Sequence, residues 1–98
     1  MPTVQDAVDR ALSALTTLAQ RGEAVEEEWQ YVTDLEAAWR ARLEEVATTR
    51  GTEPISDAVA AAVDRAGLEA EAIGDPHRAI DWLSTLPQVA LLALGEAG

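Results

Sequence analysis

The chain of 98 residues contains no cysteine, no lysine and no phenylalanine, and its only histidine is His77. Without cysteine, neither a disulfide framework nor a thiolate metal site can form. A metal site built from several histidines would need ligands from a second chain. We interpret His77 as a residue of a helix start rather than as a catalytic or ligand residue, because no second histidine accompanies it.

Long hydrophobic runs are absent as well. The longest, at residues 89–94, has six residues, whereas a membrane-spanning helix needs roughly 20. The N-terminal residues lack the charged region and the continuous apolar region of a secretory signal. We therefore expect a cytoplasmic protein that neither crosses nor binds a membrane.

Positive charge is scarce in this chain. Its 18 acidic residues outnumber its 7 arginines and give a formal net charge of −11. A nucleic-acid partner is therefore not expected, because phosphates require a basic surface. The same charge allows one alternative, an acidic decoy that imitates nucleic acid and occupies a basic site. The acids are not gathered in one long track, which makes this alternative the weaker one.

Glycine and proline are missing between Gly22 and Gly51, and this stretch has the pattern of an amphipathic helix. Its apolar residues recur at steps of mostly three and four residues, and they are Val25, Trp29, Val32, Trp39, Leu43 and Val46. A helix over 23–50 would be roughly 42 Å long, which is more than a chain of this size needs for its own core. We predict that this long helix is the central element of the fold.

Further helices are predicted on both sides of this stretch. Thr3 can cap a first helix that ends at Gly22, where a glycine in the left-handed conformation would stop it. The short connection that follows makes this helix and the helix over 23–50 an antiparallel hairpin of unequal arms. A third helix is predicted over 57–73. It runs through Gly67, although a glycine inside a helix costs about 1 kcal/mol relative to alanine.

The last helix begins at the Gly-Asp-Pro sequence of residues 74–76, which supplies a helix stop, an N-cap and a first helical residue. Pro87 is predicted to kink this helix or to be followed by a new short helix. Residues 89–94 are apolar on every side, so they are expected to be buried in the core or against another chain. The fold class is therefore predicted to be all-α. The chain forms a single domain over 1–98, a helical bundle of four to five helices built on the unequal hairpin.

No catalytic motif is present in the sequence. It contains no Glu-x-x-His pair of the kind found in carboxylate metal bundles and no Gly-rich phosphate loop. We therefore predict no enzymatic activity and no cofactor. The predicted function is a non-enzymatic protein–protein interaction module, acting as a homodimer or as a small subunit of a larger assembly. The alternative is a small helical ligand-binding domain with a pocket near the tryptophans.

The predicted partner is a second copy of the chain, paired antiparallel through residues 23–50, or else another protein. In one heptad register Trp29 lies opposite Trp39 of the second copy, and Glu28 then faces its Arg42. The predicted interface residues are Val25, Glu28, Trp29, Val32, Thr33, Leu35, Trp39, Arg42, Leu43 and Val46. The first and last helices of the same chain could cover this stripe instead, and the sequence leaves that choice open.

Overall fold

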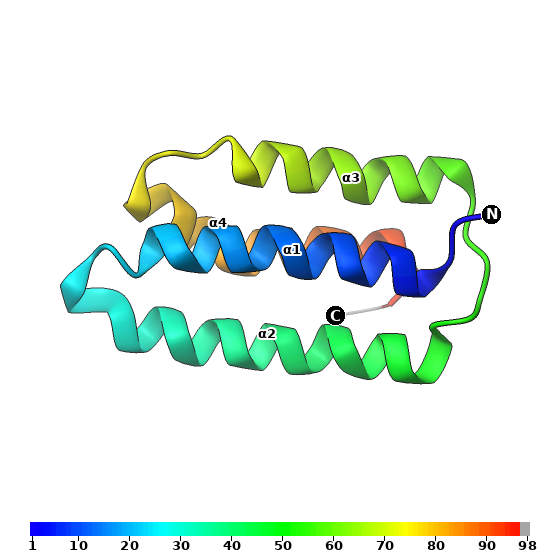
Figure 1. Cartoon of the computed structure of the whole chain (residues 1–98), viewed down its shortest axis with the longest axis horizontal. Helices are drawn as coiled ribbons and strands as arrows, with labels where there is room; N and C mark the ends of the chain where they lie inside the picture. The colour runs from blue at the N-terminus through cyan, green and yellow to red at the C-terminus, as the bar shows by residue number, and fades with distance from the viewer. Residues whose placement is uncertain (97–98) are drawn as a thin grey trace.

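The computed structural model describes residues 1–96 and has an all-α fold, as predicted (Figure 1). Its helices are α1 (Val4–Gly22), α2 (Trp29–Arg50), α3 (Asp57–Glu71) and α4 (Pro76–Ala93), with a single 3₁₀ turn, η1 (Glu26–Glu28), before α2. No helix within residues 1–96 is both long and apolar enough to cross a membrane.

The four helices form a bundle in which α1 lies between α2 and α3, with α4 behind it (Figure 1). Successive helices alternate in direction, so that α1 runs parallel to α3 and α2 runs parallel to α4. Both α1 and α4 pack against all three other helices, whereas α2 and α3 lie on opposite sides of the bundle. The core is therefore centred on the α1–α4 pair.

The central element is α1, and the prediction that the stretch 23–50 takes this place is wrong. Helix α2 buries only Val32, Leu43 and Val46, because only one face of this helix packs against the rest of the bundle. Helix α1 buries nine residues, several of them alanines that let its three neighbours approach closely: Val4, Ala7, Val8, Ala11, Ala14, Leu15, Leu18, Ala19 and Gly22.

The predicted boundary between the first two helices also needs correction. Gly22 lies within α1, and the capping residue Glu23 has an ordinary helical backbone with φ −64°. An added Cβ at Gly22 would lie 3.0 Å from Ile80 Cγ1 and 3.2 Å from Val32 Cγ2. Gly22 thus permits close helix packing and does not act as a left-handed stop. Since the chain must reverse after it, residues 23–28 form the turn and α2 begins only at Trp29.

The N-terminal ends of α1, α3 and α4 are capped by side chains, whereas the N-cap residue of α2 makes no side-chain capping hydrogen bond. Thr3 and Asp6 form a capping box at the start of α1. Asp75 Oδ1 accepts a hydrogen bond of 2.9 Å from the His77 N–H, and Pro76 is the first residue of α4. The caps predicted at Thr3 and at Asp75 are therefore confirmed.

Gly67 lies inside a continuous α3, which confirms the prediction that the helix runs through this glycine, although the helix ends at Glu71 rather than at residue 73. An added Cβ at Gly67 would lie 2.7 Å from Cζ of Arg10. The guanidinium of Arg10 donates a 2.8 Å hydrogen bond to Asp64 and also pairs with Glu71. Gly67 thus leaves the space through which Arg10 reaches two carboxylates of α3.

This arrangement predicts that Gly67→Ala has different effects in two backgrounds. In the wild-type chain, the helix-propensity gain of about 1 kcal/mol is opposed by displacement of the Arg10 guanidinium, so the free energy of unfolding changes little. In an Arg10→Ala chain the obstacle is gone, and Gly67→Ala should stabilise by about 1 kcal/mol. Urea denaturation of the four chains measures both effects. Equal effects in the two backgrounds would contradict the proposed conflict.

Pro87 neither ends α4 nor precedes a new short helix, contrary to that part of the prediction, because α4 is continuous to Ala93. The missing N–H of a proline removes one helical hydrogen bond, and its ring crowds the preceding turn. Here Pro87 is itself fully buried, and the adjacent Leu86 and Ala90 are also in the core. The packing of the turns on both sides of Pro87 therefore offsets the free-energy cost of a proline inside the helix, and α4 stays helical there.

Residues 89–94 are buried on one side only within this chain, so the expected burial in the core holds for that side, and burial of the other side would need another chain. Ala90, Leu91 and Leu94 belong to the core. Val89 is 38% exposed and Leu92 is 68% exposed. The segment therefore completes the bundle and also presents apolar side chains to the outside.

Candidate functional site

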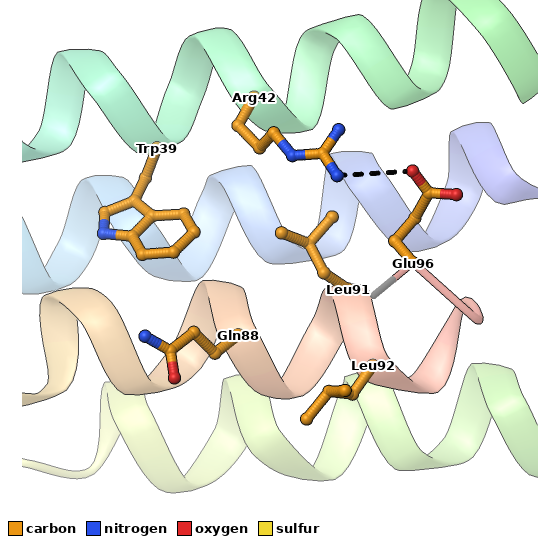
Figure 2. A pocket seen from close by; sticks show the side chains of 6 residues that line it. All are labelled: Trp39, Arg42, Gln88, Leu91, Leu92 and Glu96. Carbon is orange, nitrogen blue, oxygen red and sulfur yellow. Dashed lines mark hydrogen bonds and ion pairs between the residues drawn. The ribbon is translucent and has the colours of Figure 1, made fainter. Parts of the chain in front are cut away.

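The candidate site is a groove between the parallel helices α2 and α4, which we call the α2/α4 groove. Its first hollow, of about 420 Å³, is lined by Trp39, Arg42, Gln88, Leu91, Leu92 and Glu96 (Figure 2). Its second hollow, of about 410 Å³, is lined by Glu28, Tyr31, His77, Ile80, Asp81 and Ser84. The two hollows follow one another along the same pair of helices. Trp39 lines the first and Ser84 lines the second, and Trp39 Nε1 lies 3.4 Å from Ser84 Oγ, so the two hollows are neighbours.

The regular spacing of the lining residues follows from helix geometry. On α4 the lining positions 77, 80, 84, 88 and 91 are separated by three or four residues. Steps of three and four residues return to the same face of a helix, so these residues of α4 come from one face. The groove is therefore a row of two hollows with a helical wall on each side.

One half of the groove is mainly apolar. The indole of Trp39 extends from α2 toward α4, and Leu91 lies beside it in the interior (Figure 2). Trp39 is half-buried, Leu91 is buried and Leu92 stands exposed at the rim. Gln88 is the polar side chain of this wall. The arrangement provides an apolar floor on which another apolar side chain could pack.

Glu96 closes the end of the apolar half. Gly95 has φ +79°, and the Glu96 N–H donates to Leu91 O at 2.8 Å, as in a Schellman motif. This turn brings the Glu96 carboxylate to 2.7 Å from Arg50 and 3.5 Å from Arg42, both on α2. The pKa of Arg50 is raised, mainly by its hydrogen bond to Glu53 and next by its hydrogen bond to Glu96. The last turn of α4 is thus tied to α2.

The other half of the groove is polar and acidic. It contains the carboxylates of Glu28 and Asp81, the exposed ring of Tyr31 and the exposed His77. Within residues 1–96, neither carboxylate forms an ion pair. No group of three or more potential ligand side chains that could hold a metal ion occurs in this part of the chain. The groove therefore combines an acidic end with an apolar end.

Of the ten predicted interface residues, the structure brings three into the groove, namely Glu28, Trp39 and Arg42. Three others, Val32, Leu43 and Val46, are core residues with at most 2% exposure, and Leu35 is half-buried against the core. Trp29 and Thr33 are exposed but do not line the groove, and Val25 is half-buried in the turn before α2. In this fold α1 and α4 cover most of the predicted stripe.

The arginines expected to flank a self-paired helix have partners within the chain. Arg42 pairs with Glu96, and Arg40 pairs with Glu36 at 2.8 Å. Arg40 also donates a 2.7 Å hydrogen bond to Thr16 Oγ1 of α1. Self-pairing along the whole predicted stripe would require these contacts to break and the covering helices to move.

The α4 half of the site was not predicted as a site. The sequence marked residues 89–94 as apolar on every side, which was the signal for the exposed Leu92. It gave no indication that this segment faces Trp39 across a groove. Of the three tryptophans, Trp39 lines the groove, whereas Trp29 and Trp82 are not among the residues that line its two hollows.

Comparisons of the chain with protein-family models, with characterised proteins and with solved structures gave no match.

Proposed function

We propose that the protein is a non-enzymatic helical protein–protein interaction module that binds its partner through the α2/α4 groove. One observation carries this proposal: the groove of an otherwise acidic helical bundle is bordered by large exposed apolar side chains. Tyr31 on α2 is 54% exposed and Leu92 on α4 is 68% exposed. Exposed apolar surface of this kind, bordered by polar residues, is typical of interaction sites.

The partner is another protein, or a second copy of the chain held through α2. In the observed fold a homodimer would use the exposed residues of α2, such as Trp29 and Thr33, since the rest of the predicted stripe is buried. The net charge of −11 opposes self-association at low salt. This charge favours a heterologous partner.

The interaction itself can be tested by site-specific photo-crosslinking in the cells from which the protein comes. A photoreactive phenylalanine analogue placed at Tyr31 or at Leu92 should give a discrete adduct of higher mass. The matched control is the same analogue at Leu68, which is 58% exposed on α3, away from the groove. Absence of adducts at both groove positions, together with a monomer in sedimentation, would contradict the proposed function.

The homodimer has its own test. Thr33→Cys replaces an exposed residue in a chain without cysteine, so any disulfide formed must join two copies. An antiparallel pair centred near Thr33 predicts a covalent dimer under mild oxidation, along with sedimentation that changes with concentration. A control cysteine at Leu68 should not crosslink. A monomer at high micromolar concentration without a crosslink rejects self-pairing and leaves the heterologous partner.

A second candidate function is binding of a small apolar ligand beside Trp39. It is favoured by the hollow of about 420 Å³ that Trp39 and Leu91 line, a size within the range of small-molecule sites. A panel of apolar metabolites should then change tryptophan fluorescence in the wild-type chain. The change should be lost in Leu91→Gln, provided that circular dichroism shows this variant to be folded. No response to any compound of the panel rejects this candidate.

A further inference from the structure

We propose that the occupant of the α2/α4 groove is a basic amphipathic helix of a partner protein. This inference rests on the proposed function and deepens it by specifying the chemistry of the partner. It depends on three properties of the groove: the spacing of its side chains, its length and the sign of its charges.

The spacing of the lining residues fits a third helix. On α4 the lining side chains recur at three- and four-residue steps, and on the α2 side they form two pairs, Glu28 with Tyr31 and Trp39 with Arg42, each three residues apart. This is the spacing with which helices interlock their side chains. A helix laid between α2 and α4 would place apolar residues at positions i, i+3, i+4 and i+7 against Trp39 and Leu92. An extended peptide has a period of two residues and does not match these walls.

The length of the groove defines the length of the partner segment. Its lining positions on α4 extend from His77 to Leu92. Fifteen helical steps of 1.5 Å correspond to roughly 22 Å, so about four turns of a partner helix fill the groove. A partner segment of about 16 residues is therefore expected.

The charges of the groove favour a cationic partner. Its lining side chains include three carboxylates, of Glu28, Asp81 and Glu96, and one guanidinium, of Arg42. Arg42 is paired with Glu96, which leaves the carboxylates of the polar half to act on an incoming segment. At physiological ionic strength charges interact over about 8 Å, so lysines and arginines close to Glu28 and Asp81 are favoured. The net charge of −11 adds attraction during encounter.

A second copy of this chain is the less suitable occupant, since it brings the same net charge of −11. Five of its seven arginines are also engaged in hydrogen bonds within their own chain: Arg10, Arg21, Arg40, Arg42 and Arg50. Among residues 1–96, no helix face therefore has several available cations bordering an apolar stripe. A heterologous helix can supply both features.

The orientation of the partner follows from the direction of the groove helices. Helices α2 and α4 run parallel, and their N-terminal ends lie at the polar half of the groove (Figure 1). A partner helix that runs antiparallel to both has its dipole antiparallel to theirs, which is electrostatically favourable. Its C-terminal turns then lie beside Glu28 and Asp81, where lysine or arginine also suits the dipole of the partner helix itself. The expected segment is therefore apolar along one stripe and basic in its C-terminal half.

A displayed library of helical peptides of about 16 residues tests this inference. The peptides carry a fixed leucine stripe, and their flanking positions are randomised among lysine, glutamate, glutamine and alanine. Selection uses the full chain at about 0.15 M salt, where screening suppresses weak long-range attraction. We expect enrichment of lysine and loss of glutamate in the last two turns. Equal recovery of acidic and basic peptides would overturn the charge argument.

The best selected peptide is then synthesised, and its affinity is measured by calorimetry against folded variants. Leu92→Asp and Asp81→Lys should each weaken binding at least about tenfold, since one removes an apolar contact and the other reverses a groove charge. The matched control Leu68→Asp changes a leucine on α3 that is 58% exposed, compared with 68% for Leu92, and should leave the affinity unchanged. Equal weakening by Leu68→Asp, or no selected peptide at all, overturns the groove as the site of a basic helix.

Failure of this inference and failure of the proposed function can be told apart. If no peptide binds but photo-crosslinking at Tyr31 or Leu92 still captures a partner, the interaction module stands and the basic helix is rejected. If the chain self-associates and Leu92→Asp abolishes that association, the groove is occupied by a second copy and the heterologous helix is rejected. If neither peptides nor crosslinks are found and the chain is a monomer, both proposals fail.

Discussion

Leu15→Ala should lower the free energy of unfolding by about 2–5 kcal/mol. Leu15 is fully buried in α1, which like α4 packs against all three other helices. Truncation removes apolar contacts and leaves a cavity that three neighbouring helices can close only in part. Domains of this size are stable by about 5–15 kcal/mol, so this single change removes a large fraction of the stability. Urea denaturation followed by circular dichroism measures the loss.

The control for this experiment is the same substitution at an exposed leucine. Leu68→Ala alters a residue that is 58% exposed on α3 and should change the free energy of unfolding by less than about 0.5 kcal/mol. The difference between the two variants separates burial from the general effect of placing alanine in a helix. If Leu15→Ala cost no more than Leu68→Ala, α1 would not be the centre of the core.

Deletion of residues 89–98 should leave a chain that is partly unfolded or aggregates. The deletion removes the buried side chains of Leu91 and Leu94, and burying a leucine contributes about 1.5–3 kcal/mol. It also removes Glu96, which links the end of α4 to Arg42 and Arg50 of α2. The summed loss is comparable with the whole stability of a small domain. Thermal melting, dye binding to exposed apolar surface and sedimentation report the outcome.

A matched control separates the buried side of this segment from its exposed side. The double variant Val89→Ala/Leu92→Ala changes only residues that are 38% and 68% exposed, so it should melt close to the wild-type temperature. A truncated chain with unchanged melting and unchanged oligomeric state would show that the segment does not belong to the folded core.

Local sequence was sufficient to predict the helical class and most helix starts. The N-cap at Asp75 and the continuous helix through Gly67 depend on interactions within a few residues, and these can be recognised without knowing the rest of the fold. The apolar periodicity of residues 23–50 likewise identified the helix that became α2. These features follow from propensity, capping and periodicity, which act over one or two turns.

The erroneous predictions share one cause, which is contact between segments distant in sequence. Gly22 remains helical where Ile80 and Val32 approach it, and this approach cannot be seen from its neighbours in the chain. Pro87 remains inside α4 because packing of the core holds both flanking turns. In each case tertiary packing outweighs a local preference worth a few kcal/mol.

For the candidate site too, local sequence predicted one part and tertiary packing decided the other. The sequence alone placed Trp39, Arg42 and Glu28 on one helix and marked them as interface residues. Only the tertiary structure decided that α1 and α4 cover Val32, Leu43 and Val46, and that α4 forms the second wall of the groove. A groove is made where two helices meet, and the pair that joins its halves, Trp39 and Ser84, is 45 residues apart in the chain. Periodicity within one helix indicates which face is apolar. The packing of all four helices determines which part of that face remains exposed and can bind a partner.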